Sequence, residues 1–323
     1  MHKSIYEAVN YVFIVRFFLL VVVFSMSMVI LPYYQGGDQV YYRELYGLLK
    51  DLNIEDGYKI YFLKVGATEP LSFLFLWTGS NLDIEKDILI SFFNTILAYV
   101  IINLLIEWKV SLFIISLIIL TNYYFIVMYT GAERLKFAFI FLILSIYNTQ
   151  NLKKYLLFAI LSHFQTLLVY ASMFFVFLSK QILTLFKKGV INRNIIFIII
   201  LGVILISLFY MPILNKIEYY MIYGQVNIYK LLLFMLLTLF YARRKNNLYE
   251  VIFLFLFLII MVSIVGEERV NLIGYFIFLY YALKVKKGIN LGVLLTSMYF
   301  GIKSYEFMYN IIIYGNGFYG IGE

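Results

Sequence analysis

The chain has no cysteine among its 323 residues, and its only histidines are His2 and His163. The absence of cysteine excludes disulfide bonds, thiolate metal sites and a cysteine nucleophile. Two histidines are too few for a histidine-rich metal site, so we expect no metal and no cofactor. Charged residues are scarce at 14%, whereas hydrophobic residues make up 63% and the mean hydropathy is +0.90. No water-soluble domain of this length needs a composition this apolar.

Apolar runs of about 20 residues recur along the whole chain, and a run of that length can span a bilayer as a helix. The runs do not alternate in hydrophobicity as the strands of a transmembrane barrel do. We therefore expect an all-α, polytopic membrane protein of about ten membrane segments, forming one integral domain over residues 1–323. The full spans expected with simple boundaries are 11–31, 88–107, 110–129, 133–148, 195–211, 228–241, 248–265, 272–283 and 289–309.

Basic residues outnumber acidic ones by 26 to 18, and many of them lie in short loops between apolar runs. Loops of this kind mark the cytoplasmic side of a membrane protein. The positive charge is thus explained by membrane orientation and by contact with membrane lipids, and we expect no nucleic-acid partner. These loop residues are Lys153, Lys154, Lys180, Lys187, Lys188, Arg193, Arg243, Arg244, Lys245, Lys284, Lys286 and Lys287.

The interval 31–70 is the one long stretch early in the chain that cannot lie in a bilayer as a plain helix. It opens on the turn signal Pro32-Tyr-Tyr-Gln-Gly-Gly and ends at Glu69-Pro70. Because the N-terminus is expected inside, the interval is expected to be an outer loop, residues 32–70. Residues 69–77 then predict a half-helix on the outer side, since proline suits a first helical turn.

Residues 155–179 raise a problem of orientation, because lysines flank the apolar run on both sides. A single span would place one of these basic groups outside. A broken, re-entrant pair of half-helices with its tip near Ser162-His163-Phe164-Gln165 keeps both inside. Irregular backbone at that depth is tolerated where it lines a cavity, so His163 would face an outer cavity. The alternative is that the odd span lies at 71–79.

On this topology several ionisable side chains fall on the outer side of the membrane. Arginine suits a phosphate or diphosphate because its planar fork donates two parallel hydrogen bonds. A carboxylate or histidine within reach of a hydroxyl can act as general base, and tyrosines offer platforms for sugar rings. The candidate residues are Asp38, Tyr41, Tyr42, Glu69, Arg134, His163, Glu268 and Arg269.

Plainer interpretations stay open for two of these features. Glu69 could be no more than a capping acid in front of the helix that starts at Pro70. Glu133 and Arg134 could be an ion pair at an exposed helix end.

The order and spacing of these residues resemble the EpsG/Wzy family of bacterial polysaccharide polymerases over roughly residues 30–280. Leu135 and Phe164 stand where that family more often has glutamine and proline. The motifs that carry the resemblance are Asp38 followed by tyrosines, Glu69-Pro-Leu-Ser-Phe-Leu, Arg134-Leu-Lys-Phe-Ala-Phe, Ser162-His163 within an apolar run, and Glu268-Arg269 before a late helix.

The resemblance implies an inner-membrane glycosyltransferase that acts on the periplasmic side. It would join repeat units of O-antigen or exopolysaccharide carried on undecaprenyl diphosphate and release undecaprenyl diphosphate, with a chain-length regulator protein as a candidate partner. Arg134 and Arg269 would hold the diphosphate and stabilise its developing charge. His163 or Asp38 would activate the acceptor hydroxyl, and Glu69 would orient a sugar or an arginine.

Two other classes of function fit the sequence. One is a metal-dependent lipid-phosphosugar glycosyltransferase, in which Asp38 helps to bind a divalent cation. The other is a transporter or flippase of lipid-linked glycan, although no internal repeat typical of transporters is visible.

Overall fold

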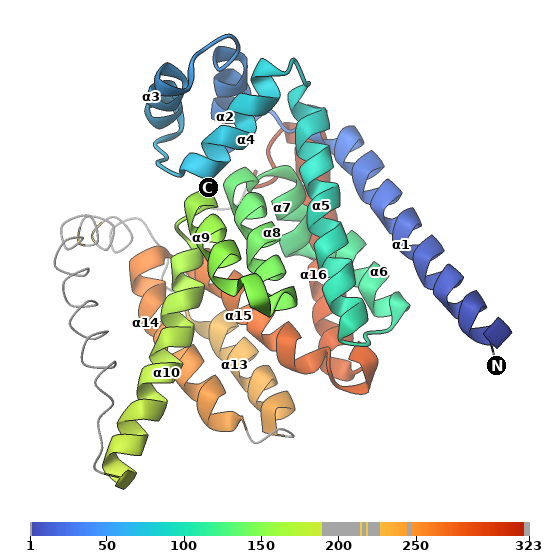
Figure 1. Ribbon diagram of the computed structural model, residues 1–323, viewed down its shortest axis with the longest axis vertical. Coiled ribbons are helices and arrows are strands. Elements are labelled where there is room, and N and C mark those ends of the chain that lie inside the picture. Colours follow the sequence, from blue (N-terminus) through green and yellow to red (C-terminus); the bar gives the residue numbers. More distant parts are fainter. Residues whose placement is uncertain (1, 189–213, 215–217, 219–226, 244–246, 320–323) are drawn as a thin grey trace. The chain divides into compact units, whose positions relative to one another are not determined.

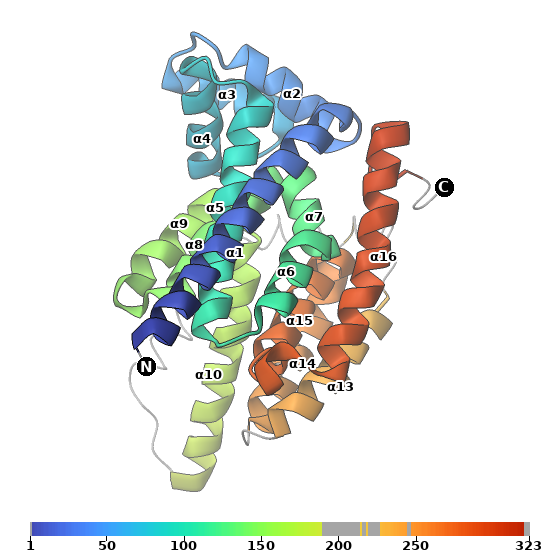
Figure 2. The same cartoon turned by 90° about the vertical axis from the view of Figure 1, so that its right-hand side faces the viewer.

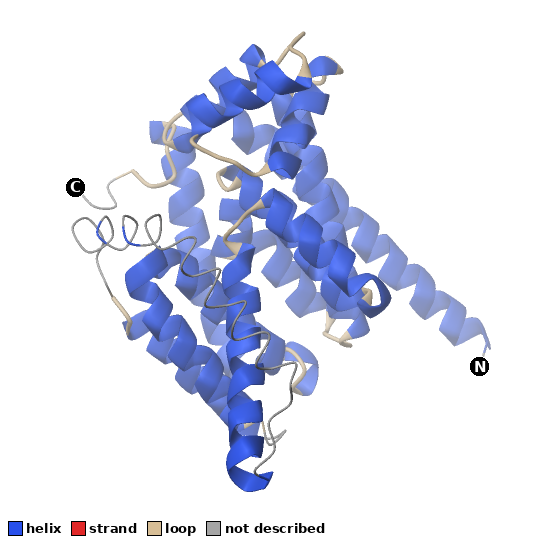
Figure 3. Cartoon of the chain, turned by 60° about the vertical axis from the view of Figure 1, so that its left-hand side comes forward, coloured by secondary structure: helices blue, strands red, loops and turns tan. Residues whose placement is uncertain are grey.

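The computed structural model describes residues 2–188, 214, 218, 227–243 and 247–319. Every regular element within these residues is a helix, which confirms the all-α expectation (Figure 3). The chain divides into two compact units, one comprising Met1–Thr166 with Lys286–Glu323 and the other Leu167–Val285. The expectation of a single integral domain stays a prediction.

Three of the described helices are long and apolar enough to cross a membrane by themselves: Tyr11–Tyr33, Lys86–Glu107 and Leu248–Val265. Two bent pairs raise the number to five if each pair is one span: Leu112–Thr121 with Tyr123–Thr130, bent by 50°, and Glu133–Tyr147 with Thr149–Ser162, bent by 116°. The protein is thus a helical membrane protein. The described residues do not support the expected ten segments, and the span expected at 195–211 lies outside them.

The first unit is built around two long helices that pack side by side, α1 (His2–Ile30) and α5 (Lys86–Glu107) (Figure 1). Helices α2 (Asp38–Leu48), α3 (Ile54–Val65) and α4 (Pro70–Asn81) gather at one end of α5 in both views (Figures 1 and 2). The other elements of this unit are η1 (Leu31–Tyr33), α6 (Leu112–Thr121), α7 (Tyr123–Thr130), α8 (Glu133–Tyr147), η2 (Thr149–Asn151), α9 (Leu152–Ser162), η4 (Lys286–Gly288) and α16 (Leu291–Tyr314).

The interval expected to be an outer loop contains two helices, α2 (Asp38–Leu48) and α3 (Ile54–Val65). Helix α3 has clear end signals: the Asn53 side chain accepts from the Asp56 amide, and Gly66 ends the helix with a φ of 61°. The short helix expected from Glu69 is confirmed as α4 (Pro70–Asn81), with proline in its first turn. This interval is therefore a helical cap.

The helical cap is tied to the rest of the first unit by polar contacts and by close packing. Arg43 of α2 forms a forked pair with Asp87 at the start of α5, with nitrogen–oxygen distances of 3.0 and 3.2 Å. A Cβ on Gly79 of α4 would lie 2.4 Å from Leu89 and 2.7 Å from the Tyr46 hydroxyl, so a larger residue there would force these side chains to move. The shared core of this region is Leu31, Tyr42, Leu45, Tyr46, Leu49, Tyr61, Ala67, Phe73, Leu76, Leu89, Ile90 and Phe137.

Helices α8 and α9 pack against each other as a hairpin that turns at Asn148–Asn151 (Figure 1). The sequence placed the re-entrant pair over 155–179, whereas the sharp bend joins α8 to α9. The expected tip at 162–165 is nonetheless a break between helices, because α9 ends at Ser162 and α10 (Thr166–Lys188) begins after it. The Ser72 hydroxyl of α4 donates to the Ser162 carbonyl over 2.6 Å, which holds this break beside α4.

The second unit contains most of α10 together with α13 (Tyr229–Ala242), α14 (Leu248–Val265) and α15 (Glu267–Ala282). Within this unit α13 packs on α14 and α15, and Lys180 pairs with Glu250. Gly274 lets α15 approach α13 closely, since a Cβ there would lie 2.6 Å from Leu231.

Candidate functional site

The Glu69 carboxylate joins three segments of the first unit. Its Oε2 accepts a hydrogen bond from Arg134 Nη1 over 2.8 Å, and its Oε1 lies 2.9 Å from His163 Nδ1. The Glu69 side chain is only 5% exposed, whereas Arg134 retains 25% and His163 15% of their side-chain surface. We call Glu69, Arg134 and His163 the ion-pair triad. The structure therefore brings together three of the residues that the sequence singled out.

Glu69 stands at the N-cap of α4, yet its side chain makes no capping hydrogen bond there. The interpretation of Glu69 as a simple capping acid is therefore wrong. Burial by itself would raise the pKa of this carboxyl, but the hydrogen bond from His163 and the charge of Arg134 outweigh burial and lower the pKa to about 2. Glu69 is thus ionised at every physiological pH.

The contact with Glu69 fixes how the His163 ring carries its proton. A carboxylate only accepts hydrogen bonds, so Nδ1 must be the nitrogen that donates. Nε2 is then the nitrogen that can take up a further proton, and once protonated it can donate to the side-chain oxygen of Gln165, which lies 3.2 Å away. A carboxylate that orients an imidazole in this way is the arrangement found in many general bases.

Two buried tyrosines of the helical cap lie next to the triad. Tyr42 on α2 and Tyr61 on α3 are both within electrostatic range of the Arg134 guanidinium. Burial raises the pKa of both phenols above their ordinary values, so both are neutral donors. Because Tyr42 is buried, its ring does not offer the exposed sugar platform that the sequence suggested. The neighbouring Tyr41 is 53% exposed and keeps that option.

A second polar network lies one residue along α8 from Arg134. Glu133 pairs with Lys86 Nζ over 2.6 Å, and the same nitrogen donates to Gln39 Oε1 over 2.8 Å. The Lys136 ammonium donates to the Tyr129 carbonyl over 3.3 Å. All four side chains are buried, so we call Lys86, Glu133, Gln39 and Lys136 the sealed network. An exposed Glu133–Arg134 pair at a helix end, considered above, is wrong, because each residue pairs elsewhere.

The remaining predicted site residues lie apart from the triad or in the second unit. Asp38 is the exposed first residue of α2 and is within electrostatic range of Tyr34 and Tyr42. Glu268 and Arg269 are exposed in the first turn of α15. Their neighbour Glu267 accepts from the Asn227 amide over 2.9 Å. The triad therefore lies within the first unit alone.

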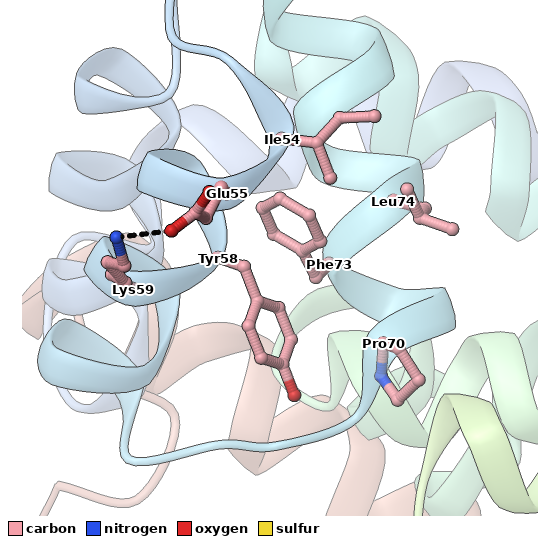
Figure 4. Close-up of a pocket in the computed structure, with 7 residues that line it drawn as sticks. All are labelled: Ile54, Glu55, Tyr58, Lys59, Pro70, Phe73 and Leu74. Carbon is pink, nitrogen blue, oxygen red and sulfur yellow. Dashed lines mark hydrogen bonds and ion pairs between the residues drawn. The ribbon is translucent and has the colours of Figure 1, made fainter.

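An apolar depression of about 400 Å³ opens between α3 and α4, and Pro70, the residue after Glu69, is part of its lining. The Tyr58 and Phe73 rings meet across it at 5.3 Å between centroids, and the Lys59–Glu55 ion pair lies at its rim (Figure 4). The Tyr58 hydroxyl donates to the Thr68 carbonyl over 2.8 Å, which fastens α3 to the segment leading into Glu69. Its lining residues are Ile54, Glu55, Tyr58, Lys59, Pro70, Phe73 and Leu74.

The sequence interpretation missed the roles of Tyr61, Lys86 and Gln39. A signal for Lys86 was present, since a lysine at the start of an apolar span is expensive unless it is paired. Tyr61 and Gln39 carry no such signal, because their importance depends on which helices pack together. Within the described residues, no three histidine, aspartate or glutamate side chains gather as metal ligands would.

The site thus combines a partly exposed arginine fork, an imidazole oriented by a carboxylate, and neighbouring phenols. Such a set can hold an anionic group and accept a proton from a hydroxyl. Comparisons of the chain with protein-family models, with curated proteins and with solved structures gave no match.

Proposed function

We propose that this protein is a polysaccharide polymerase that joins lipid-diphosphate-linked oligosaccharide repeat units at a membrane surface. The observation that carries the proposal is the ion-pair triad: one carboxylate holds both an arginine suited to diphosphate and a histidine suited to proton transfer. Transfer of a glycan from a lipid diphosphate to a hydroxyl needs these two functions and no redox group.

In the proposed reaction, His163 Nε2 removes the proton from the acceptor hydroxyl of the incoming unit. The hydroxyl oxygen bonds to the anomeric carbon of the growing chain, and the bond from that carbon to the diphosphate breaks. Arg134 stabilises the negative charge that develops on the departing lipid diphosphate. Glu69 stabilises the imidazolium that forms at His163. The base could also be Asp38, but the oriented ring of His163 favours the histidine.

The setting of the proposed reaction is the one that the sequence leads us to expect. The chain would lie in a bacterial cytoplasmic membrane through about ten segments, with the basic loops inside and the triad facing the periplasm or the outside. The substrate would be an undecaprenyl-diphosphate-linked O-antigen or exopolysaccharide unit. Arg269 and Glu268 of the second unit are proposed to assist in holding it, and a chain-length regulator protein is a proposed partner.

The first experiment is the surface-polysaccharide gel profile of a strain from which the gene has been deleted. A polymerase predicts that the ladder of chain lengths collapses to a single repeat unit on its acceptor. Complete loss of the glycan would point instead to an earlier step such as lipid-phosphosugar transfer or flipping. An unchanged profile for lipopolysaccharide, capsule and exopolysaccharide alike would overturn the proposal.

A further inference from the structure

Tyr61 is a buried tyrosine whose hydroxyl makes no hydrogen bond within the described part of the chain. Its ring packs against Phe73 at 5.6 Å and Tyr58 at 6.3 Å between centroids. Burying a hydroxyl without a partner costs stability, and a phenylalanine would avoid that cost. The hydroxyl therefore calls for an explanation other than packing.

The contacts of the Tyr61 ring lead to the segment that carries Glu69. Tyr58 donates to the Thr68 carbonyl, and the Phe73 amide donates to the Glu69 carbonyl over 3.2 Å. Glu69 and Arg134 are also among the charged groups that act on the Tyr61 hydroxyl. The Tyr61 ring thus packs against the segment that carries Glu69, and its unpartnered hydroxyl is within electrostatic range of the Glu69 carboxylate.

The triad as it stands has its arginine occupied. Arg134 Nη1 donates to Glu69, so a diphosphate that binds the guanidinium fork through this nitrogen must compete with a carboxylate for it. A buried carboxylate that loses its arginine keeps only His163 as a donor, and a poorly satisfied buried charge is unfavourable. Substrate binding would become easier if a second donor were waiting for Glu69.

We propose that Tyr61 is this second donor and is a positioning residue for Glu69. When the diphosphate takes Arg134, Oε2 of Glu69 turns to the Tyr61 hydroxyl while Oε1 keeps its bond from His163. This inference rests on the proposed function. The exchange needs no access for the ligand to Tyr61, which suits a side chain that is fully enclosed.

An unpartnered hydroxyl alone does not identify such a residue, and Tyr129 provides the matched control. Tyr129 is also fully buried, and its hydroxyl likewise has no partner in the described part of the chain. The Tyr129 ring packs against Phe125 of its own helix at 6.5 Å between centroids, whereas the Tyr61 ring packs against Phe73, which lies one turn after Glu69. Removal of the two hydroxyls should therefore affect stability alike and anion binding differently.

The experiment measures binding of inorganic pyrophosphate to the full-length protein in detergent by calorimetry, alongside thermal unfolding. Tyr61→Phe should weaken binding roughly tenfold, the value of one hydrogen bond to a charged group, with unfolding at an equal or higher temperature. Tyr129→Phe should bind as the wild type does. Glu69→Gln should bind about tenfold more tightly, because a neutral amide does not compete for Arg134.

Two outcomes would overturn the inference about Tyr61, and a third would also overturn the proposed function. Equal binding by Tyr61→Phe and the wild type would mean that no exchange takes place, while leaving the proposed function in place. A lower unfolding temperature for Tyr61→Phe, without the same change in Tyr129→Phe, would mean that the hydroxyl already has a structural partner. Absence of pyrophosphate binding in both the wild type and Glu69→Gln would remove the anion site, and the proposed function with it.

Discussion

Glu133 and Arg134 are neighbours in the chain, yet they belong to two different kinds of polar network. Glu133 is fully buried and pairs with a buried lysine, whereas Arg134 is partly exposed and pairs with Glu69 at the break between α9 and α10. A sealed pair fixes how helices meet but cannot reach a substrate. A partly exposed pair can exchange its partner for a ligand. One turn of helix α8 thus presents a buried charge and a partly exposed one.

The largest expected effect is on folding, at the sealed network. Glu133→Gln removes the one acidic side chain that balances Lys86 and lies near Lys136. Breaking a buried ion pair on one side costs about 3–5 kcal/mol, so we expect a sharply lower unfolding temperature in detergent and little protein in the membrane.

The double variant Lys86→Met/Glu133→Met is the control for that prediction. It removes both charges together and replaces them with apolar side chains, so it should lose much less stability than Glu133→Gln. If Glu133→Gln unfolds at the wild-type temperature, the sealed network is not structural and the contrast with the triad fails.

The next effect is on activity, at the triad. Arg134→Lys keeps the charge and the pairing with Glu69 but loses the planar fork. We expect a loss of polymerisation of about 10²–10³-fold, comparable to removal of one donor to a developing oxyanion, with normal protein levels. The measurement is the glycan ladder of a deletion strain that carries the variant.

Lys64→Arg serves as the matched control, because Lys64 is an exposed basic residue of α3 that pairs with Glu44. It should restore the wild-type ladder. Full activity of Arg134→Lys would remove Arg134 from the site.

The pH dependence of stability tests the ion pairing of Glu69 in the triad. The pKa of Glu69 is lowered from 4.5 to about 2, so its ionised pairing stabilises the fold fully above about pH 4.5 and is lost as the pH falls towards 2. The lowered pKa corresponds to a contribution of about 3 kcal/mol. The difference in stability between the wild type and Glu69→Gln should be constant from pH 8 to 5 and shrink below that. A difference that grows on acidification would contradict the assignment.

The comparison also shows what the sequence could predict. Long apolar runs predict the membrane class because the length and hydropathy of a run can be read from consecutive residues, without knowing which helices pack together. Glu69, Arg134 and His163 attracted notice for the same reason: an ionisable side chain at the mouth of an apolar helix is expensive. Their mutual contact was not predictable, because the helix end expected at residue 148 does not show how sharply the chain bends there, and the bend between α8 and the segment that follows is 116°.

The two helices of the helical cap, α2 and α3, were not predicted, for a different reason. Its acidic and tyrosine-rich composition suggested a loop, although Asn53 with Asp56 and the terminal Gly66 signal a helix. If α2 is recognised as a helix, Tyr41 and Tyr42 are expected to face different surroundings, since adjacent helical residues point about 100° apart. One of them is exposed and the other is buried, as that geometry requires.

The smallest expected effect is that of Asp38→Asn, and its comparison with His163→Gln tests the choice of base. Asp38 is exposed at the start of α2, and no side chain within the described residues holds it in place, whereas His163 is oriented by Glu69. Asp38→Asn should therefore change the rate of polymerisation by less than about fivefold, or roughly 1 kcal/mol. His163→Gln should lower the rate by about 10²–10⁴-fold, the usual contribution of a general base. A purified protein that elongates glycan in detergent allows both rates to be measured against pH. If Asp38→Asn is inactive while His163→Gln retains its rate, the base lies on the helical cap, and the histidine only holds Glu69 in place.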